Sequence, residues 1–232
     1  MPSLEARTRL SLVSLTLAYI INALLADLGR GVADLSMLLL FVVSVALMSS
    51  RMRLIPLLPL LASAIGFSFE YIGLNFALPF GSYSYLRLRG FALQGVPVPV
   101  IVAWGVYAYT CYLAASHLTS GRMKLLSASL LMVLLDLALD PVMVERGLWK
   151  WNAGGEWFGV PLTNYAGWFL VSILSMALYA LISGGRDLNV RLPHQAYIPY
   201  LSSYLVILMS SGPASTLPAY LAFSLALLPL LR

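Results

Sequence analysis

The sequence predicts an all-helical protein that crosses a membrane several times, and two observations carry that prediction. Of its 232 residues, 60% are hydrophobic and only 10% are charged, whereas soluble domains are usually about half apolar. The mean hydropathy is +0.88, and several apolar stretches approach the roughly 20 residues that a helix needs to cross a bilayer core. Helices are expected because backbone groups in lipid must be hydrogen-bonded within their own segment.

Eight apolar stretches are candidates for membrane spans. We predict helices at Leu10–Ala26, Ala33–Ser49, Leu54–Ala77, Val98–His117, Leu125–Val144, Leu162–Ser183, Ala196–Ser211 and Leu217–Leu231. The seventh stretch contains Pro199 and starts in a polar connection. The alternative is therefore a protein with seven spans, in which this stretch is a re-entrant or interfacial segment. Because no repeat, low-complexity tract or soluble domain is evident, residues 1–232 are expected to form a single transmembrane domain.

The basic residues predict the orientation of these spans, because Lys and Arg gather near the cytoplasmic ends of membrane helices. With eight spans, nine of the 14 basic residues fall on the side of the N-terminus and five on the other. The nine are Arg7, Arg9, Arg51, Arg53, Arg122, Lys124, Arg186, Arg191 and Arg232, and the five are Arg30, Arg87, Arg89, Arg146 and Lys150. We therefore expect a multi-pass protein of the cell membrane with both termini in the cytoplasm.

Two acidic residues inside the fifth stretch, Asp136 and Asp140, are the most informative feature for function. A charged group at bilayer depth is costly, so one that persists there usually faces a cavity, a partner or a substrate. On a helix the two lie one turn apart on one face. Burial disfavours the charged form and a second carboxylate disfavours it further, so the pair is expected to share one proton. Pro141 follows directly, and we expect a kink or break at Asp140.

Short motifs in the middle of the chain resemble a known family. They are Pro79-Phe-Gly-Ser-Tyr-Ser-Tyr85, Gly95-Val-Pro-Val-Pro99, Asp136-Leu-Ala-Leu-Asp140-Pro-Val-Met-Val144, Gly147-Leu-Trp-Lys-Trp151 and Phe158-Gly-Val-Pro-Leu-Thr-Asn-Tyr-Ala-Gly-Trp168. In order and spacing these motifs resemble the signature blocks of the CruF-type carotenoid hydratases, a membrane carotenoid-biosynthesis family that includes the archaeal bisanhydrobacterioruberin hydratases. The resemblance covers a motif-bearing core of about residues 65–170. It implies cofactor-free addition of water to a terminal isoprenoid double bond of an acyclic or monocyclic C40 or C50 carotenoid.

The residues suit this chemistry on independent grounds. Hydration of a trisubstituted alkene requires a proton donor, stabilisation of a tertiary carbocation and delivery of water. We expect Asp136 or Asp140 to be the general acid, and the other carboxylate or Glu70, in the third stretch, to hold the attacking water. The sequence leaves open which carboxylate does which.

Aromatic side chains are expected to surround the cation and the polyene. A desolvated aromatic face stabilises a cation by roughly 0.5 to 2 kcal/mol, and its apolar surface suits a polyene. The expected substrate-binding residues are Tyr71, Tyr83, Tyr85, Trp104, Trp149, Trp151, Trp157, Phe158, Asn164 and Trp168. The alternative for the tryptophans is an aromatic belt at the membrane interface, and for the asparagine a cap on loop backbone.

Other functional classes have little support. His117 and His194 lie far apart and no phosphate loop, dinucleotide fingerprint or nucleophile elbow is present, so neither a metal nor another cofactor is expected. Basic and aromatic residues do not interleave as nucleic-acid binding requires. The expected partners are a lipophilic polyene, water and membrane lipid. A proton-coupled transporter, or an isoprenoid isomerase or cyclase that protonates an alkene and then loses a proton, remains an alternative.

Overall fold

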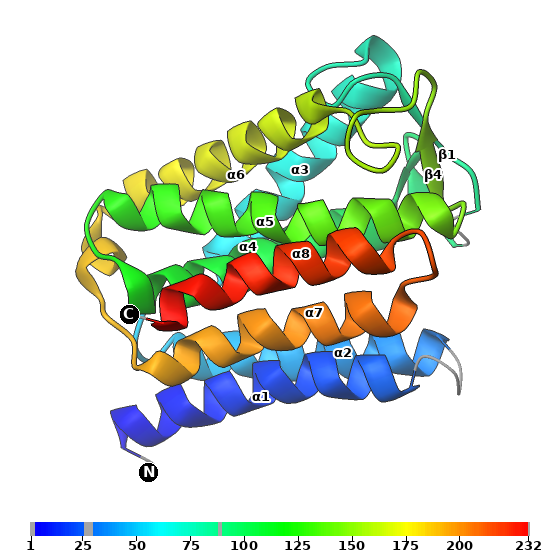
Figure 1. The fold of residues 1–232 in the computed structure, drawn as a ribbon. Coiled ribbons are helices and arrows are strands. Elements are labelled where there is room, and N and C mark those ends of the chain that lie inside the picture. The colour runs from blue at the N-terminus through cyan, green and yellow to red at the C-terminus, as the bar shows by residue number, and fades with distance from the viewer. Residues whose placement is uncertain (1–2, 26–29, 88–89, 232) are drawn as a thin grey trace.

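In the part of the chain that it describes, the structure is a bundle of eight α-helices that run side by side (Figure 1). It is a computed structural model and describes residues 3–25, 30–87 and 90–231. Ala26, Arg89 and Arg232, which entered the predictions above, lie outside the described residues. The helices are α1 (Leu4–Leu25), α2 (Arg30–Met48), α3 (Leu57–Phe76), α4 (Val98–Leu118), α5 (Met123–Glu145), α6 (Leu162–Ile182), α7 (Ile198–Ser210) and α8 (Thr216–Leu227).

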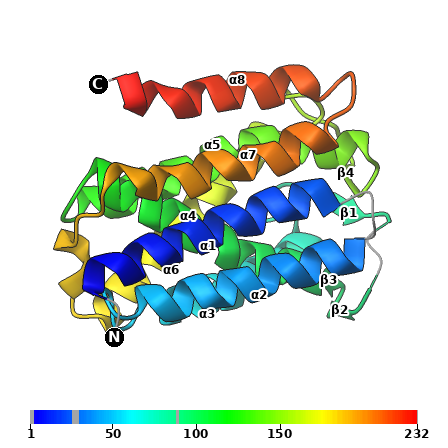
Figure 2. The same cartoon turned by 90° about the horizontal axis from the view of Figure 1, so that it is seen from below.

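Each predicted span coincides with one of these helices, which confirms the all-helical, polytopic class. In the described part of the chain, α1 to α6 are long and apolar enough to cross a membrane. The last two helices are shorter, with 13 and 12 residues. Short 3-10 turns extend both, at His194–Tyr197 before α7 and at Leu228–Leu231 after α8. Helix α7 packs along α1, and α8 packs along α5 and α7 (Figure 2).

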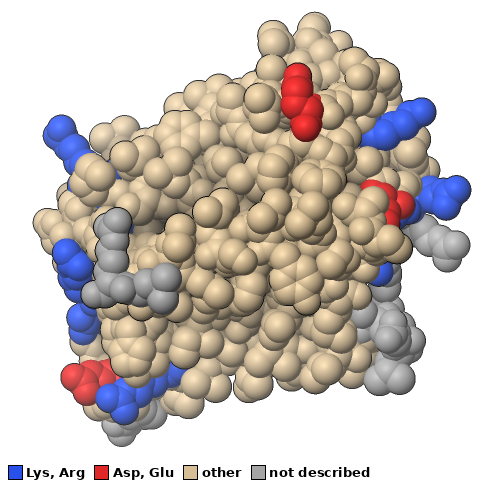
Figure 3. All heavy atoms as spheres, viewed as in Figure 1, with Lys and Arg blue, Asp and Glu red and all other residues tan. Residues whose placement is uncertain are grey.

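The two ends of the bundle carry different parts of the chain. The start of α1 and the end of α8 lie at the same end (Figures 1 and 2), as an even number of crossings requires. Lys and Arg side chains lie at both ends of the visible face, and none is seen in the middle of it (Figure 3). The short β-strands lie at the end away from the termini (Figure 1).

Small polar side chains join the helices in the interior. The hydroxyls of Ser11 on α1, Ser44 on α2 and Tyr109 on α4 lie within 3.0 to 3.4 Å of one another. A second bond joins the Tyr19 hydroxyl to that of Thr110 at 2.8 Å. Because lipid offers no hydrophobic driving force between helices, such bonds and close packing hold membrane bundles together.

A two-stranded ribbon joins the connections that follow α3 and α5. Strand β1 (Tyr83–Tyr85) pairs antiparallel with β4 (Trp149–Trp151), with Tyr83 opposite Trp151 and Tyr85 opposite Trp149. Side chains alternate along a strand, so these four aromatic rings share one face of the ribbon. A second hairpin, β2 (Ala92–Leu93) with β3 (Val96–Pro97), leads directly into α4. Its turn residues, Gln94 and Gly95, both have positive φ angles, as a tight hairpin turn requires.

The expected break at Asp140 is wrong, because α5 continues through Pro141 to Glu145. A proline has no amide N–H, so the carbonyl of Leu137, four residues earlier, loses its helical partner. The indole Nε1 of Trp157 donates to this carbonyl oxygen at 2.9 Å. A side chain from the connection before α6 thus replaces the missing backbone bond and lets the helix continue.

This replacement predicts a non-additive effect on stability. Trp157→Phe should destabilise the protein by about 1–3 kcal/mol, because it leaves a partly buried carbonyl without its donor. In a Pro141→Ala background the same change should cost clearly less, since the new amide at 141 can bond to Leu137 again. Unfolding of the four proteins in detergent micelles, followed by circular dichroism, measures this double-mutant cycle. Equal costs in both backgrounds would contradict it.

Candidate active site

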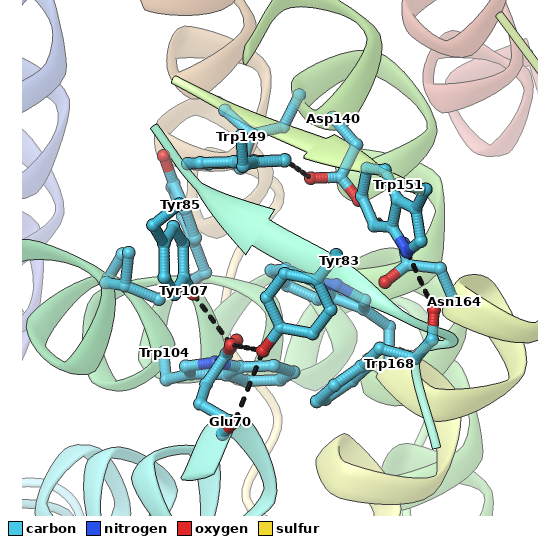
Figure 4. Close-up of a pocket in the computed structure, with 14 residues that line it drawn as sticks. Glu70, Tyr83, Tyr85, Trp104, Tyr107, Asp140, Trp149, Trp151, Asn164 and Trp168 are labelled. Carbon is cyan, nitrogen blue, oxygen red and sulfur yellow. Dashed lines mark hydrogen bonds between the residues drawn. The ribbon is translucent and has the colours of Figure 1, made fainter. Parts of the chain in front are cut away.

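A partly open cavity of about 60 Å³ lies among α3, α4, α5 and α6, beside the β1–β4 ribbon (Figure 4). This volume is enough for several water molecules or a small apolar group. Its walls are made by Glu70, Phe80, Tyr83, Tyr85, Val100, Ala103, Trp104, Tyr107, Leu139, Asp140, Trp149, Trp151, Asn164 and Trp168.

Glu70 on α3 is buried and receives three hydrogen bonds. Its Oε2 accepts from the hydroxyls of Tyr83 at 2.5 Å and Tyr85 at 2.7 Å, and its Oε1 accepts from Trp104 Nε1 at 3.0 Å. Burial, and after it the Glu70 carboxylate, raise the pKa of both ribbon tyrosines, so their phenols stay protonated and can donate. Three hydrogen-bond donors suit an ionised carboxylate, because such a group can only accept hydrogen bonds.

Asp140 forms part of the opposite wall, as Figure 4 shows. Its Oδ1 accepts from Trp149 Nε1 at 3.2 Å, and its Oδ2 accepts from the amide of Asn164 at 2.6 Å. The same Asn164 amide donates to Asp136 Oδ2 at 2.8 Å. The two aspartates therefore converge on one amide nitrogen, as expected from their spacing on one helical face. Asp136 is fully buried behind Asp140 and is not part of the cavity wall.

Aromatic rings occupy the space between the two carboxyl groups (Figure 4). The rings of Trp104 on α4 and Trp168 on α6 stack with their centroids 4.1 Å apart. On the ribbon, the centroids of Tyr83 and Trp151 lie 5.9 Å apart, as do those of Tyr85 and Trp149. The cavity thus presents both π-faces and N–H or O–H donors.

Most of the predicted site residues meet at this cavity, but four do not line it. Tyr71 and Phe158 are 40% and 41% exposed. Trp157 donates to the Leu137 carbonyl instead, and Asp136 accepts from Asn164 without forming part of the cavity wall. The predicted residues that form the wall are Glu70, Tyr83, Tyr85, Trp104, Asp140, Trp149, Trp151, Asn164 and Trp168.

The sequence analysis missed several lining residues, and helical spacing could have found some of them. Val100, Ala103 and Tyr107 lie at positions −4, −1 and +3 relative to Trp104, which is the pattern of one helix face. Leu139 and Phe80 lie inside two of the motifs described above, but nothing in those motifs sets them apart as cavity residues. In the part of the chain that the structure describes, no three His, Cys, Asp or Glu side chains gather as metal ligands would.

The fold and the cavity together define an integral membrane protein with a buried acidic and aromatic site. The chain belongs to the family described as carotenoid biosynthesis protein, which it matches over residues 31–229; this confirms the family resemblance found in the sequence. It is also 30% identical over 121 residues to a bisanhydrobacterioruberin hydratase of Haloarcula japonica. That match covers 49% of this chain and 40% of the relative. No solved structure matches the chain significantly.

The position of Trp104 depends on the glycine opposite it, which gives a test of the cavity's packing. A Cβ at Gly66 on α3 would lie 2.4 Å from Cγ of the Trp104 ring. Gly66→Ala should therefore displace the indole and destabilise the protein by about 1–3 kcal/mol. Gly31→Ala is the matched control, because a Cβ there meets nothing within 4 Å. Thermal unfolding in detergent compares the two variants, and equal stabilities would contradict the packing argument.

Proposed function

We propose that the protein is a carotenoid hydratase, which adds water to a terminal isoprenoid double bond of an acyclic or monocyclic C40 or C50 carotenoid and gives a tertiary alcohol. One observation carries the proposal: the cavity places Asp140 and Glu70 on opposite walls with aromatic faces between them. Membership of the carotenoid biosynthesis family and the name of the hydratase relative support the substrate class.

The aspartate pair is the proposed acid. Two negative charges that share a single amide donor in a buried site would be costly, so the pair holds one proton. Asp140 is the member at the cavity wall, and it transfers the proton to the less substituted carbon of the double bond. The π-electron pair forms the new C–H bond and leaves a tertiary carbocation on the neighbouring carbon.

The aromatic wall is proposed to stabilise that cation. The stacked pair of Trp104 and Trp168 and the ribbon tyrosines and tryptophans offer π-faces on the cavity wall. Each desolvated face contributes roughly 0.5 to 2 kcal/mol. None of these rings carries a strong nucleophile, so the cation survives until water reaches it.

Glu70 is the proposed base for the attacking water. As the water oxygen bonds to the carbocation, one of its protons passes to the Glu70 carboxylate, and the product is the neutral alcohol. The proton then returns through cavity water to the aspartate pair. Alkene and water are consumed, the alcohol is formed, and the reaction needs no oxidant, reductant or cofactor.

The bundle suggests separate routes for the two reactants. A long polyene is insoluble in water, so we propose that it reaches the cavity laterally from lipid, past the apolar surface of the helices. Water would arrive from the ribbon end of the bundle, where the cavity lies. From the excess of basic residues near the termini, we propose that this ribbon end faces away from the cytoplasm.

The acid assignment predicts the effect of one substitution. Asp140→Asn should lower hydration about 100-fold or more, because the amide cannot donate a proton of sufficient acidity. Asp34→Asn, at an exposed aspartate on α2, is the matched control and should keep wild-type activity. Both are measured in reconstituted vesicles with an acyclic carotenoid and analysis of the pigments by HPLC. Full activity in Asp140→Asn would end the assignment.

Isotope incorporation tests the reaction class itself. In oxygen-18 water, a hydratase should give a hydroxylated carotenoid that is two mass units heavier than in ordinary water, since the hydroxyl oxygen comes from solvent. An isomerase or cyclase would change the carotenoid without incorporating the label, and a transporter would leave it unchanged. Either of those results would overturn the proposed function.

A further inference from the structure

The cavity is large enough for the end of a carotenoid but not for the whole molecule. Its volume of about 60 Å³ is well below the roughly 150 Å³ of a cavity that binds one benzene ring. The space between Asp140 and Glu70 therefore suits a terminal double bond with its methyl groups. The rest of a C40 or C50 chain must lie outside the cavity, so it has to leave through an open side.

One side of the cavity is less buried than the rest. Of the 14 lining residues, five are only partly buried, and the others are buried. The five are Val100, Ala103 and Tyr107 on α4 and Tyr85 and Trp149 on the ribbon. In Figure 4, Tyr85, Tyr107 and Trp149 lie on the side away from Trp168. The cavity therefore opens between α4 and the ribbon.

The opposite side is closed by Phe80, whose ring fills the space between α3 and α6. A Cβ at Gly73 on α3 would lie 3.0 Å from Cδ2 of this ring, and a Cβ at Gly167 on α6 would lie 2.6 Å from its Cδ1. Trp151 Nε1 donates to the Phe80 carbonyl at 2.8 Å, and Phe80 is only 2% exposed. A polyene cannot pass between these two helices here without displacing the ring.

The partly buried side has a shape and a chemistry that suit a polyene. Val100, Ala103 and Tyr107 follow one another at intervals of three and four residues, so they share one face of α4. Ala103 has the smallest side chain and lies between the two larger ones, so the face is lowest there. Opposite this face, Tyr85 and Trp149 pair across the ribbon, with ring centroids 5.9 Å apart. None of the five side chains is charged.

We propose that the carotenoid chain leaves the cavity over Ala103, between α4 and the pair of Tyr85 and Trp149, while its terminal group lies on the side of Phe80. The inference rests on the proposed hydratase function and deepens it, because it assigns the path of the chain at that same site. Ala103 lies in the second turn of α4, a helix that is long and apolar enough to span the membrane. The path therefore leads sideways into lipid, where a polyene dissolves.

A bulky residue at Ala103 tests this path. Ala103→Trp should raise the Kd for an acyclic C40 carotenoid about 10-fold or more and lower kcat/KM for its hydration by a similar factor, because the indole takes the place of the chain. Binding is measured in detergent micelles by the visible circular dichroism that a polyene acquires on a protein, and hydration by HPLC of the pigments. Wild-type binding and turnover in Ala103→Trp would overturn the proposal.

Val102→Trp is the matched control. Val102 is the neighbouring residue on α4, is 38% exposed and does not line the cavity, so the same indole there should leave binding and hydration unchanged. If both variants lost binding equally, the effect would be a general one of adding bulk to α4, and the path would be excluded. If thermal unfolding shows that Ala103→Trp does not fold, Ala103→Leu takes its place and should raise the Kd about 3-fold. A folded Ala103→Leu protein that binds like the wild type would contradict the path.

The binding measurement separates this inference from the proposed function. If the wild type binds the carotenoid and Ala103→Trp does not, but no labelled alcohol forms in oxygen-18 water, the hydratase proposal fails and the path is retained. If the wild type and Ala103→Trp form labelled alcohol at the same rate, the path fails and the hydratase proposal is retained.

Discussion

A carboxyl group inside a membrane bundle needs hydrogen-bond donors, and the arrangement around the cavity follows from that need. Glu70 and Asp140 sit within the helices α3 and α5, whose own amides are used in backbone bonding. Their donors come mainly from the segments that follow these helices, through Tyr83, Tyr85 and Trp149. Those segments therefore fold back over the bundle and pair as the β1–β4 ribbon.

The aromatic residues of the site combine two physical roles. The indole of Trp104 donates to Glu70 and also stacks on Trp168. The same ring therefore provides a hydrogen bond to a buried acceptor and presents a π-face. Trp157 uses its N–H differently, to satisfy the carbonyl that Pro141 leaves free in α5. The same chemistry that suits a cation-forming reaction therefore also holds the polar parts of the bundle together.

The ribbon end of the bundle is also tied to the last two helices. Glu145, the final residue of α5, accepts backbone N–H bonds from Gly212, Ala214 and Ser215 in the connection before α8. A Cβ at Gly212 would lie 2.5 Å from a Glu145 oxygen, so a larger residue there would require the Glu145 side chain to shift. The helix that carries both aspartates is thereby hydrogen-bonded, at its last residue, to the connection before α8.

The sequence was enough to predict the helical membrane class, the positions of the eight described helices, the family and most of the residues that line the cavity. Those conclusions rest on hydropathy, on local spacing and on short motifs, which are properties of neighbouring residues. Tertiary structure decided that α5 continues through Pro141, that Asp136 lies behind Asp140, and that Tyr107 belongs to the wall whereas Tyr71 and Phe158 do not. The physical reason is that a buried polar atom takes its partner from wherever the fold places one, as Leu137 does from Trp157 twenty residues away.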